Sequence, residues 1–424
     1  MVRDTSPSLF RDRNFRRLYY STTVSQISVN ITIVVVPLVA ILVLDANEFQ
    51  VGLLSAFGSL ALLVVGLPAG VWVDRLSRRK VLIVTDLARA FFLMTIPIAA
   101  FMGILSIWQL YAIVFLVGIA TVFFDVAYTS YIPSLVGSDN LTRANANLEV
   151  VRNVSRLGGP TISGPLVAIL SGPLAILIAA LSMGASVGWV VRIQRPEASE
   201  RVFRKLNLRR EINEGMRFVF KDPILRAIAI SAAWGNLSAG VLQAMVILFL
   251  ARDLSLPEVT IGVILASSGV GGILGAMAVK HVSKLIGFGP ATWVSLALAG
   301  PAAIMIPLAE PDWRIIFAML GQAIFAFGVI IFNVTQLSYR QAVTPDALLG
   351  RVNATLRFLG LGALPIGSFV GGLIGEIYGV RTSLWIAGVM LCAGFIPLVL
   401  TPLRNMKEIP SAEDQGATLS TVGK

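Results

Sequence analysis

A succession of long apolar segments, separated by short polar connections, is the feature that most constrains this chain. An α-helix needs about 20 apolar residues to cross the hydrocarbon core of a bilayer, and each segment reaches this length. Charged residues make up only 13% of the sequence, about half of the share that is usual in a soluble domain. We therefore predict an all-α membrane protein with twelve transmembrane helices. The apolar segments lie at 18–44, 51–73, 81–103, 106–132, 147–170, 173–193, 224–251, 259–279, 288–309, 313–339, 352–377 and 381–402.

The basic residues indicate on which side of the membrane the ends of the chain lie. Of the 34 Lys and Arg residues, all but four fall in the N-terminal segment, the C-terminal tail and every second connection with its helix ends. The four exceptions are Arg89, Arg252, Arg314 and Arg381. Basic residues accumulate in cytoplasmic loops, so we expect a multi-pass protein of the prokaryotic cytoplasmic membrane with both termini in the cytoplasm. The same rule explains the net charge of +11 without a nucleic-acid partner.

The chain contains an internal repeat. When the sequence is shifted by 208 positions, nine of the 25 residues from 124 to 148 match without a gap. The matching pairs are Phe124/Phe332, Val126/Val334, Ser130/Ser338, Tyr131/Tyr339, Leu141/Leu349, Arg143/Arg351, Asn145/Asn353, Ala146/Ala354 and Leu148/Leu356. A displacement by six spans preserves orientation, so the two halves are predicted to be parallel six-helix repeats.

This duplication predicts the domain organisation. We expect an N-terminal six-helix half at 1–193, a cytoplasmic linker at 194–222, a C-terminal six-helix half at 223–403 and a disordered cytoplasmic tail at 404–424. Two parallel repeats of this kind are typical of secondary transporters, whose substrate site lies between the repeats near the middle of the membrane. We expect the protein to act as a monomer.

The sequence offers no constellation for catalysis or for a cofactor. Its single cysteine, Cys392, lies in an apolar segment and its single histidine, His281, in a short loop, so neither a disulfide nor a His/Cys metal site is expected. The glycine-rich stretch GVGGILGAM (269–277) lacks the GK[ST] of a phosphate-binding loop and has the spacing of helix packing. We therefore expect no enzyme, no metal and no cofactor, and transport that is driven by an ion gradient.

A charged motif, GVWVDRLSRRK (70–80), follows the second apolar segment. Its glycine permits a neighbouring helix to approach, and its aspartate can face the positive N-terminal end of a helix. The pattern resembles the loop signature of the major facilitator superfamily, which implies an inner-gate latch whose partner is the eleventh span, beginning near Arg351. A basic loop exposed to solvent is the alternative. The residues of the expected latch are Gly70, Asp74, Arg75, Arg78 and Arg79.

The fifth segment contains RLGGPTISGPL, which resembles in part the antiporter signature of exporting members of that superfamily. Proline removes a backbone hydrogen bond and glycine thins a helix, so Gly159, Pro160 and Gly164 predict a bend that packs tightly on a neighbour. The resemblance implies that this seam seals the cavity against proton leakage. Ordinary helix packing is the alternative.

Three longer phrases resemble the third drug:proton antiporter family, which contains enterobactin exporters and macrolide efflux proteins. The phrases are LTRANANLEVVRNVSRLGGP, RREINEGMRFVFKDPILRAIA and FFDVAYTSYIPSLV. The resemblance runs through most of the chain and implies proton-coupled efflux. The chain also departs from the family, because the fourth span has no arginine in LYAIVFLVGIA and Ser134 stands where some relatives carry an acid. The usual proton-coupling machinery is therefore incomplete.

Ionisable residues within the spans are functional candidates, because a charge in the hydrocarbon costs several kcal/mol. Asp125 in the fourth span is the candidate proton-coupling acid, and a structural role as the partner of Arg89 is its alternative. Asp86 and Arg89, three residues apart in the third span, are further candidates but can satisfy each other, which favours a structural pair. Charges that share one face of the fifth span are expected to form ion pairs of the gate: Glu149, Arg152 and Arg156.

Amides and aromatic residues on the expected cavity helices predict the lining of the substrate cavity. They are Gln26, Asn30, Tyr128, Trp234, Asn236, Gln243, Asn333 and Gln336. Such a lining suits a largely apolar ligand with a few polar groups. It does not suit a sugar phosphate or a dicarboxylate, which would require arginines. Each of these residues can equally serve helix packing.

Taken together, these features predict a secondary transporter that exports a hydrophobic or amphipathic small molecule, such as a drug, a macrolide or a siderophore. Protons are the expected coupling ion, and alternating access is the expected mechanism. Uptake or lysophospholipid flipping on the same fold is one alternative. A membrane sensor or assembly partner that no longer transports is another.

Overall fold

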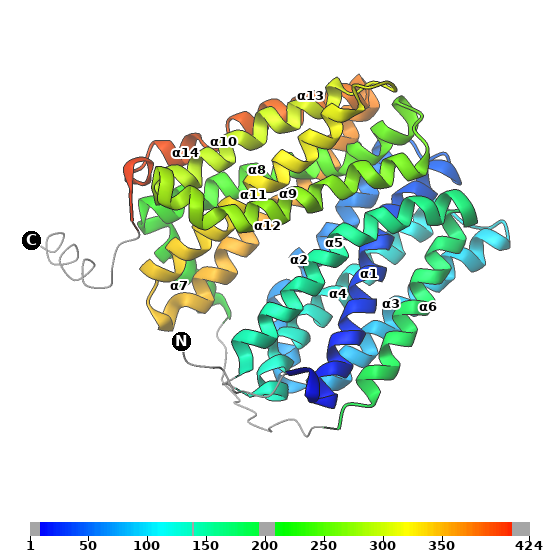
Figure 1. Cartoon of the computed structure of the whole chain (residues 1–424), viewed down its shortest axis with the longest axis horizontal. Helices are drawn as coiled ribbons and strands as arrows, with labels where there is room; N and C mark the ends of the chain where they lie inside the picture. Colours follow the sequence, from blue (N-terminus) through cyan, green and yellow to red (C-terminus); the bar gives the residue numbers. More distant parts are fainter. Residues whose placement is uncertain (1–8, 138–139, 195–207, 409–424) are drawn as a thin grey trace, which may run out of the picture. The chain divides into compact units, whose positions relative to one another are not determined.

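The computed structural model describes residues 9–137, 140–194 and 208–408, and the regular elements within these ranges are helices (Figure 1). Six long helices come first: α1 (Arg13–Leu42), α2 (Glu48–Arg75), α3 (Arg78–Phe101), α4 (Ile107–Val136), α5 (Leu141–Leu170) and α6 (Gly172–Val191). The shorter α7 (Leu208–Lys221) lies in the predicted linker. The remaining helices are α8 (Pro223–Leu248), α9 (Glu258–Ile286), α10 (Phe288–Met305), α11 (Ile315–Val343), α12 (Asp346–Tyr378), α13 (Val380–Cys392) and α14 (Ile396–Val399). The predicted tail from residue 409 onward lies outside the described residues.

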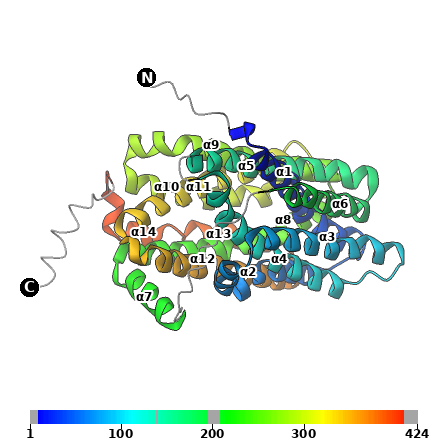
Figure 2. The ribbon, with the colours of Figure 1, turned by 90° about the horizontal axis from the view of Figure 1, so that it is seen from below.

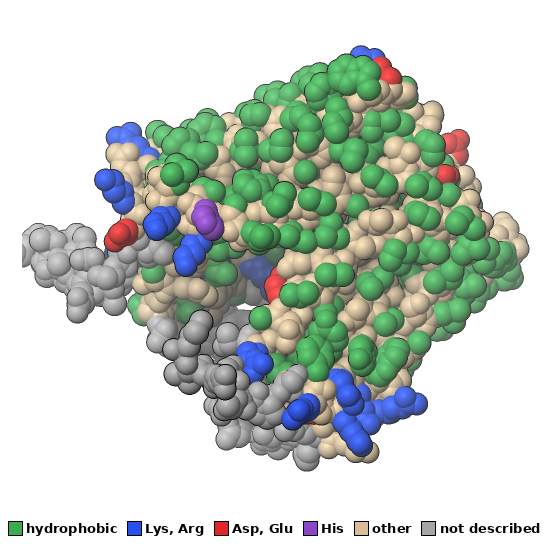
Figure 3. All heavy atoms as spheres, viewed as in Figure 1, with side chains coloured by type: hydrophobic (Ala, Val, Ile, Leu, Met, Phe, Trp, Pro, Cys, Tyr) green, Lys and Arg blue, Asp and Glu red, His purple; other side chains and the backbone are tan. Residues whose placement is uncertain are grey.

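Eleven of the described helices are long and apolar enough to cross a membrane. The remaining predicted span, 147–170, lies within the 30-residue α5, which carries the charged residues Glu149, Arg152 and Arg156. Hydrophobic side chains cover much of the visible face, and the basic side chains gather mainly at the left and lower edges of the view (Figure 3). An apolar exterior suits a protein in a bilayer. There, a helix also satisfies every backbone polar group within its own segment.

An aspartate begins the first helix of each half. The carboxylate of Asp12 accepts hydrogen bonds from two backbone N–H groups of the first turn of α1, at 2.7 and 3.4 Å. The carboxylate of Asp222 accepts two such bonds at the start of α8, both at 2.8 Å. Three residues after each aspartate, Phe15 and Leu225 are fully buried. The cap therefore satisfies free N–H groups and fixes where the apolar face of the helix begins.

Contacts divide the chain into two compact units. Unit 1 comprises the described residues of Met1–Asn47, Phe57–Phe203 and Leu256–Ala266. Unit 2 comprises the described residues of Glu48–Ala56, Arg204–Ser255 and Ser267–Lys424. The units follow the predicted halves except at the starts of α2 and α9, and the boundaries at 193 and 223 stay a prediction.

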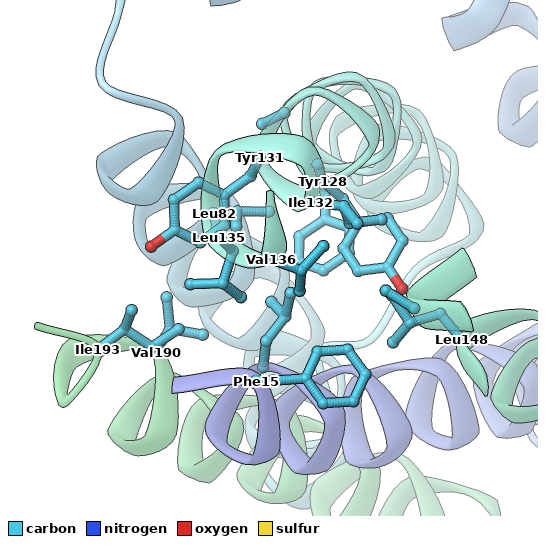
Figure 4. Close-up of a cluster of buried hydrophobic side chains, with 14 of the residues drawn as sticks. Phe15, Leu82, Tyr128, Tyr131, Ile132, Leu135, Val136, Leu148, Val190 and Ile193 are labelled. Atoms are coloured by element: carbon cyan, nitrogen blue, oxygen red, sulfur yellow. The ribbon is translucent and has the colours of Figure 1, made fainter. Parts of the chain in front are cut away.

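The core of unit 1 joins all six of its long helices, including α2 through Val73. Phe15 of α1, Leu82 of α3, Tyr131 of α4, Leu148 of α5 and Val190 of α6 converge on one cluster of buried side chains (Figure 4). Helix α6 packs against both α1 and α3, and α5 packs against α1 (Figure 2). A single apolar cluster thus holds the helix ends of this unit together.

The core of unit 2 uses residues related to those of unit 1 by the internal repeat. Helix α12 packs along α8 and contacts α7, while α10 packs against α11 and α13 (Figures 1 and 2). Among the matched pairs of the repeat, three are buried in the two cores: Phe124/Phe332, Tyr131/Tyr339 and Leu148/Leu356. The matched residues of the repeat therefore occupy equivalent positions in the cores of the two units.

The cap of α8 gives a first prediction. Replacing Asp222 by alanine removes the acceptor for two N–H groups and should lower the free energy of unfolding by about 1 kcal/mol. The melting temperature of the purified protein in detergent would measure this loss. The variant Asp222→Asn keeps an acceptor oxygen and should melt close to the wild type. An equal loss in both variants would show that the cap does not stabilise α8.

Candidate functional site

A cavity of about 540 Å³ opens within unit 2. Its walls come from α8, α10, α11, α12 and α13. Cavities of this size typically hold small-molecule ligands. Its apolar wall consists mainly of Ile228, Ala232, Ala239, Leu296, Phe325, Val329, Phe332, Leu356, Leu361 and Leu391. Its polar side chains are Ser231, Asn236, Asn333, Gln336, Arg340, Asn353 and Arg357.

Helical periodicity brings these side chains to the cavity. On α11, Phe325, Val329, Gln336 and Arg340 are separated by four, seven and four residues, so they share one face of the helix. The lining residues of α8 and α12 follow the same spacing of three and four. The cavity therefore lies where one face of each of three long helices is not covered by a neighbour.

Several polar groups of the cavity have no partner within the protein. The Nδ2 of Asn236 donates to the carbonyl oxygen of Ala232 at 2.8 Å, so this amide is engaged. In contrast, three buried atoms lack a hydrogen bond to any described residue: Ser231 Oγ, Arg340 Nε and Asn353 Oδ1. Buried polar atoms are nearly always paired, so these three remain available to a ligand or to water.

The structure brings together some of the predicted cavity residues. Asn236, Asn333 and Gln336 line this cavity, and their role as substrate contacts stays a prediction. Trp234 instead donates its Nε1 hydrogen to the carbonyl oxygen of Met390 at 2.6 Å and ties α8 to α13. Gln243 is exposed and is not part of this lining.

The other three predicted cavity residues belong to unit 1. Asn30 donates its Nδ2 hydrogen to the carbonyl oxygen of Gln26 at 2.8 Å on α1. Tyr128 is buried and stacks on Phe124 of α4, with ring centroids 5.9 Å apart. Their role as substrate contacts stays a prediction.

The lining of this cavity also includes two arginines that were not among the predicted cavity residues. Arg340 of α11 and Arg357 of α12 both contribute to its wall. Sequence reasoning missed them because it counted them among the basic residues near a loop. A signal was present, since the residues 208 positions earlier are Ile132 and Glu149, so neither arginine belongs to the shared pattern of the repeat.

Asp86 and Arg89 form a buried pair in unit 1. The carboxylate of Asp86 is ion-paired with Arg89 and accepts hydrogen bonds from the hydroxyls of Ser25 and Ser186, each at 3.1 Å. The Arg89 guanidinium also lies 4.3 Å from the ring centroid of Phe124. The pair therefore fastens α3 to α1, α4 and α6. Arg89 consequently pairs with Asp86 and does not serve as the partner of Asp125.

Asp125 is half-buried on α4, close to Tyr128. On α5, Arg152 lies 5.4 Å from the ring centroid of Tyr128 and 3.9 Å from the carboxylate of Glu149. Arg156, also predicted for the gate, is exposed and forms no ion pair with any residue in the described ranges. An acid, an aromatic ring and an ion pair thus meet between α4 and α5.

The glycines of the fifth span form close helix contacts in unit 1. A Cβ added at Gly159 would lie 2.3 Å from the Cβ of Asn30, and one added at Gly164 would lie 2.4 Å from the carbonyl oxygen of Glu258. Gly262 of α9 in turn faces the carbonyl oxygen of Pro160. Helix α5 therefore packs on α1 and on the start of α9 with no room for side chains.

The latch residues lie at the end of α2 and the start of α3. A Cβ added at Gly70 would meet no described atom within 4 Å, and close packing of the eleventh span on this glycine stays a prediction. Arg79 donates from Nε to the carbonyl oxygen of Val190 at 3.2 Å and from a terminal nitrogen to that of Val191, which caps α6. Arg75 is exposed and Arg78 half-buried, whereas the side chain of Asp74 lies outside the described residues.

The expected partner of the latch has a contact of its own within unit 2. Arg351, near the start of α12, forms an ion pair with Glu214 of α7. A Cβ added at Gly215 would lie 2.7 Å from the carbonyl oxygen of Arg351, so the two helices touch closely here. The linker helix is therefore fastened to α12.

The sequence matches known transporters over most of its length. The profile of the family described as "Transmembrane secretion effector" matches residues 5–421. The multidrug efflux pump Tap of Mycolicibacterium fortuitum is 28% identical over 389 residues, which cover 89% of this chain and 93% of that protein. The enterobactin exporter EntS of Salmonella typhi is 23% identical over 412 residues, which cover 95% and 96%.

Solved structures show the same fold. The nucleoside transporter NupG superposes with a TM-score of 0.77 at 13% identity and covers 92% of this chain and 99% of that one. A bacterial homologue of the iron transporter ferroportin gives a TM-score of 0.70 at 18% identity, with 93% and 99% covered. The predicted all-α membrane fold of two six-helix repeats is confirmed.

The buried pair of unit 1 generates a prediction about stability. Replacing Arg89 by alanine leaves the carboxylate of Asp86 buried without its partner and should cost about 3–5 kcal/mol of the free energy of unfolding. The control is Arg152→Ala, which removes a partly exposed pair and should change the melting temperature little. Similar losses in the two variants, measured by thermal melting in detergent, would contradict a structural role for the Asp86–Arg89 pair.

Two adjacent glycines of α5 offer a matched test of the seam. The variant Gly159→Ala places a Cβ 2.3 Å from that of Asn30, so the yield of folded protein and its melting temperature should fall sharply. A Cβ at Gly158 meets only the end of the Ile162 side chain, at 4.0 Å, so Gly158→Ala should be tolerated. Tolerance of both variants would mean that α5 and α1 are not in close contact in the membrane.

Proposed function

The chain belongs to the transmembrane secretion effector family of the major facilitator superfamily, and we propose that it exports a hydrophobic or amphipathic small molecule in exchange for protons. It is a multi-pass membrane transporter and not an enzyme. The observation that carries the proposal is the cavity of unit 2, which combines long apolar walls with a few convergent polar groups. Such a lining suits a ligand that is apolar over most of its surface.

Efflux is the direction that we propose. The relatives that match most of the chain include proteins named as a multidrug efflux pump and as an enterobactin exporter. In addition, the close packing of Gly159 and Gly164 supports a tight seam along α5, which limits leakage of protons beside the substrate path. Uptake and lysophospholipid flipping on the same fold, or a protein that only senses its ligand, would give different results in the test below.

Asp125 is the acid that we propose for proton coupling. It is half-buried next to an aromatic ring and an ion pair, so a change in the access of water would change its affinity for a proton. Asp86 is less suited to this role, because its two carboxylate oxygens are already engaged by Ser25, Ser186 and Arg89. Arg89 is therefore a positioning partner of Asp86 in this proposal.

We also propose the orientation and setting of the transporter. Both termini lie in the cytoplasm of a prokaryotic cell and the protein works as a monomer in the cytoplasmic membrane. The basic residues of alternate connections support this orientation. The segment from Gly70 to Arg79 then lies at the inner gate, where Asp74, Arg75 and Arg78 are proposed to latch the halves together, together with the gate charges Glu149, Arg152 and Arg156.

Everted membrane vesicles test the coupling. With the lumen acidified, adding erythromycin, enterobactin or lysophosphatidylcholine to vesicles that contain the wild-type protein should release protons from the lumen for at least one compound. The variant Asp125→Asn should abolish this release, because an amide cannot carry the proton. The control Asp312→Asn removes a carboxylate from an exposed connection and should behave as the wild type.

The outcomes separate the alternatives. Proton release that persists in Asp125→Asn would contradict the role of this acid while leaving efflux intact. Movement of a compound out of the everted vesicles would indicate uptake by the cell. Binding of a compound without any transport would indicate a sensor.

A further inference from the structure

We propose that the cavity of unit 2 binds the acidic group of an amphipathic anion through Arg340 and Arg357. This inference rests on the proposed function, since it takes this cavity to be the place where the exported molecule binds. It narrows the substrate class from hydrophobic or amphipathic molecules to those that carry a carboxylate or a similar anion at one end.

The charged residues that line the cavity are all basic. Its lining includes two arginines and no acidic residue. Neither Arg340 nor Arg357 forms an ion pair with any residue that the structure describes. Arg340 is half-buried, so its unpaired charge is costly and an anion that enters the cavity offsets this cost. Arg357 is exposed and remains accessible to such an anion. A guanidinium matches a carboxylate with two parallel hydrogen bonds.

Unpartnered hydrogen-bonding atoms lie beside these charges. The buried Nε of Arg340 is a donor without an acceptor, whereas the buried Oδ1 of Asn353 is an acceptor without a donor. The hydroxyl of Ser231, also buried, lacks a partner as well. A ligand with an acidic group and a neighbouring hydroxyl or N–H group would satisfy all three atoms.

Polarity changes along the cavity. On α11, the lining runs from Phe325 and Val329 to Arg340, a distance of about 22 Å at 1.5 Å per residue. On α12, Asn353 and Arg357 come before Leu361 in the lining, so the charged end is again near the connection between α11 and α12. An elongated ligand would therefore place its acid at this end and its apolar body along α11.

An arginine at the end of a transmembrane helix usually extends its side chain toward the membrane surface, but this explanation does not apply to both residues. Arg340 lies three residues before the end of α11 and could extend toward the surface. Arg357, however, lies eleven residues after the first residue of α12, which is about 16 Å along the helix. The repeat supports the same conclusion, because the other half has Ile132 and Glu149 at the related positions and still folds.

Binding of a matched pair of ligands tests the inference. The probes are radiolabelled 1-naphthaleneacetate and its neutral amide, 1-naphthaleneacetamide, which differ in the charge but hardly in shape. Full-length protein in detergent is captured on scintillation-proximity beads. The wild type should bind the acid about tenfold more tightly than the amide, or more, as expected of a charged hydrogen bond.

Variants of Arg340 and Arg357 test whether these two residues cause the preference for the acid over the amide. In Arg357→Gln and in Arg340→Gln, affinity for the acid should fall about tenfold while affinity for the amide stays unchanged. Arg357→Lys, which keeps the charge but not the paired geometry, should lose less than Arg357→Gln. The control Arg404→Gln removes an exposed arginine outside the cavity lining and should bind both probes as the wild type does.

The result separates this inference from the proposed function. Equal affinity of the wild type for the two probes, no binding of the acid, or an equal loss of both probes in the arginine variants would each overturn the acidic-group inference. If neutral compounds still drive proton release in everted vesicles, efflux stands without it. If the acid binds selectively but nothing is transported, the anion site is supported and the efflux function is not.

Discussion

Every backbone N–H and C=O group inside a bilayer must find its hydrogen-bond partner within the protein, and this requirement shapes the whole molecule. It makes helices the elements of the fold and leaves their lateral packing to side chains. Glycines supply the close contacts: Gly271 faces the carbonyl oxygen of Ala323, and Gly367 faces that of Leu237. Where helices approach so closely, no side chain separates them, and van der Waals contact between backbones holds the bundle together.

Polar groups within these bundles occur in two contrasting states. The carboxylate of Asp86 is paired with Arg89 and accepts hydrogen bonds from two serine hydroxyls. These interactions hold α1, α3 and α6 together. In the cavity of unit 2, by contrast, Arg340 and Asn353 each keep an atom without a partner. A fully paired network stabilises one arrangement, whereas an incompletely paired one becomes more stable when a ligand binds.

The internal repeat preserves packing but not chemistry. Phe124 and Phe332 occupy the two cores, and so do Tyr131 and Tyr339, because the same helix crossing needs the same volumes. Positions outside the two cores are freer to change, as the exposed residues Glu149 and Arg357 show with their opposite charges. Duplication thus supplied two similar scaffolds that differ in the charges they carry outside their cores.

Local sequence determined the helices, their approximate ends, the repeat and the family, because apolar length, basic loops and motif spacing are properties of contiguous residues. It also predicted that Asp86 and Arg89 can pair and that amides would line a cavity. Only the tertiary structure decided that Arg79 caps α6 and that two arginines face the cavity. These facts depend on which helix lies beside which and on which face, and that is set by packing between segments far apart in the chain. Hydropathy gives a helix its length, but its neighbours give each side chain its surroundings.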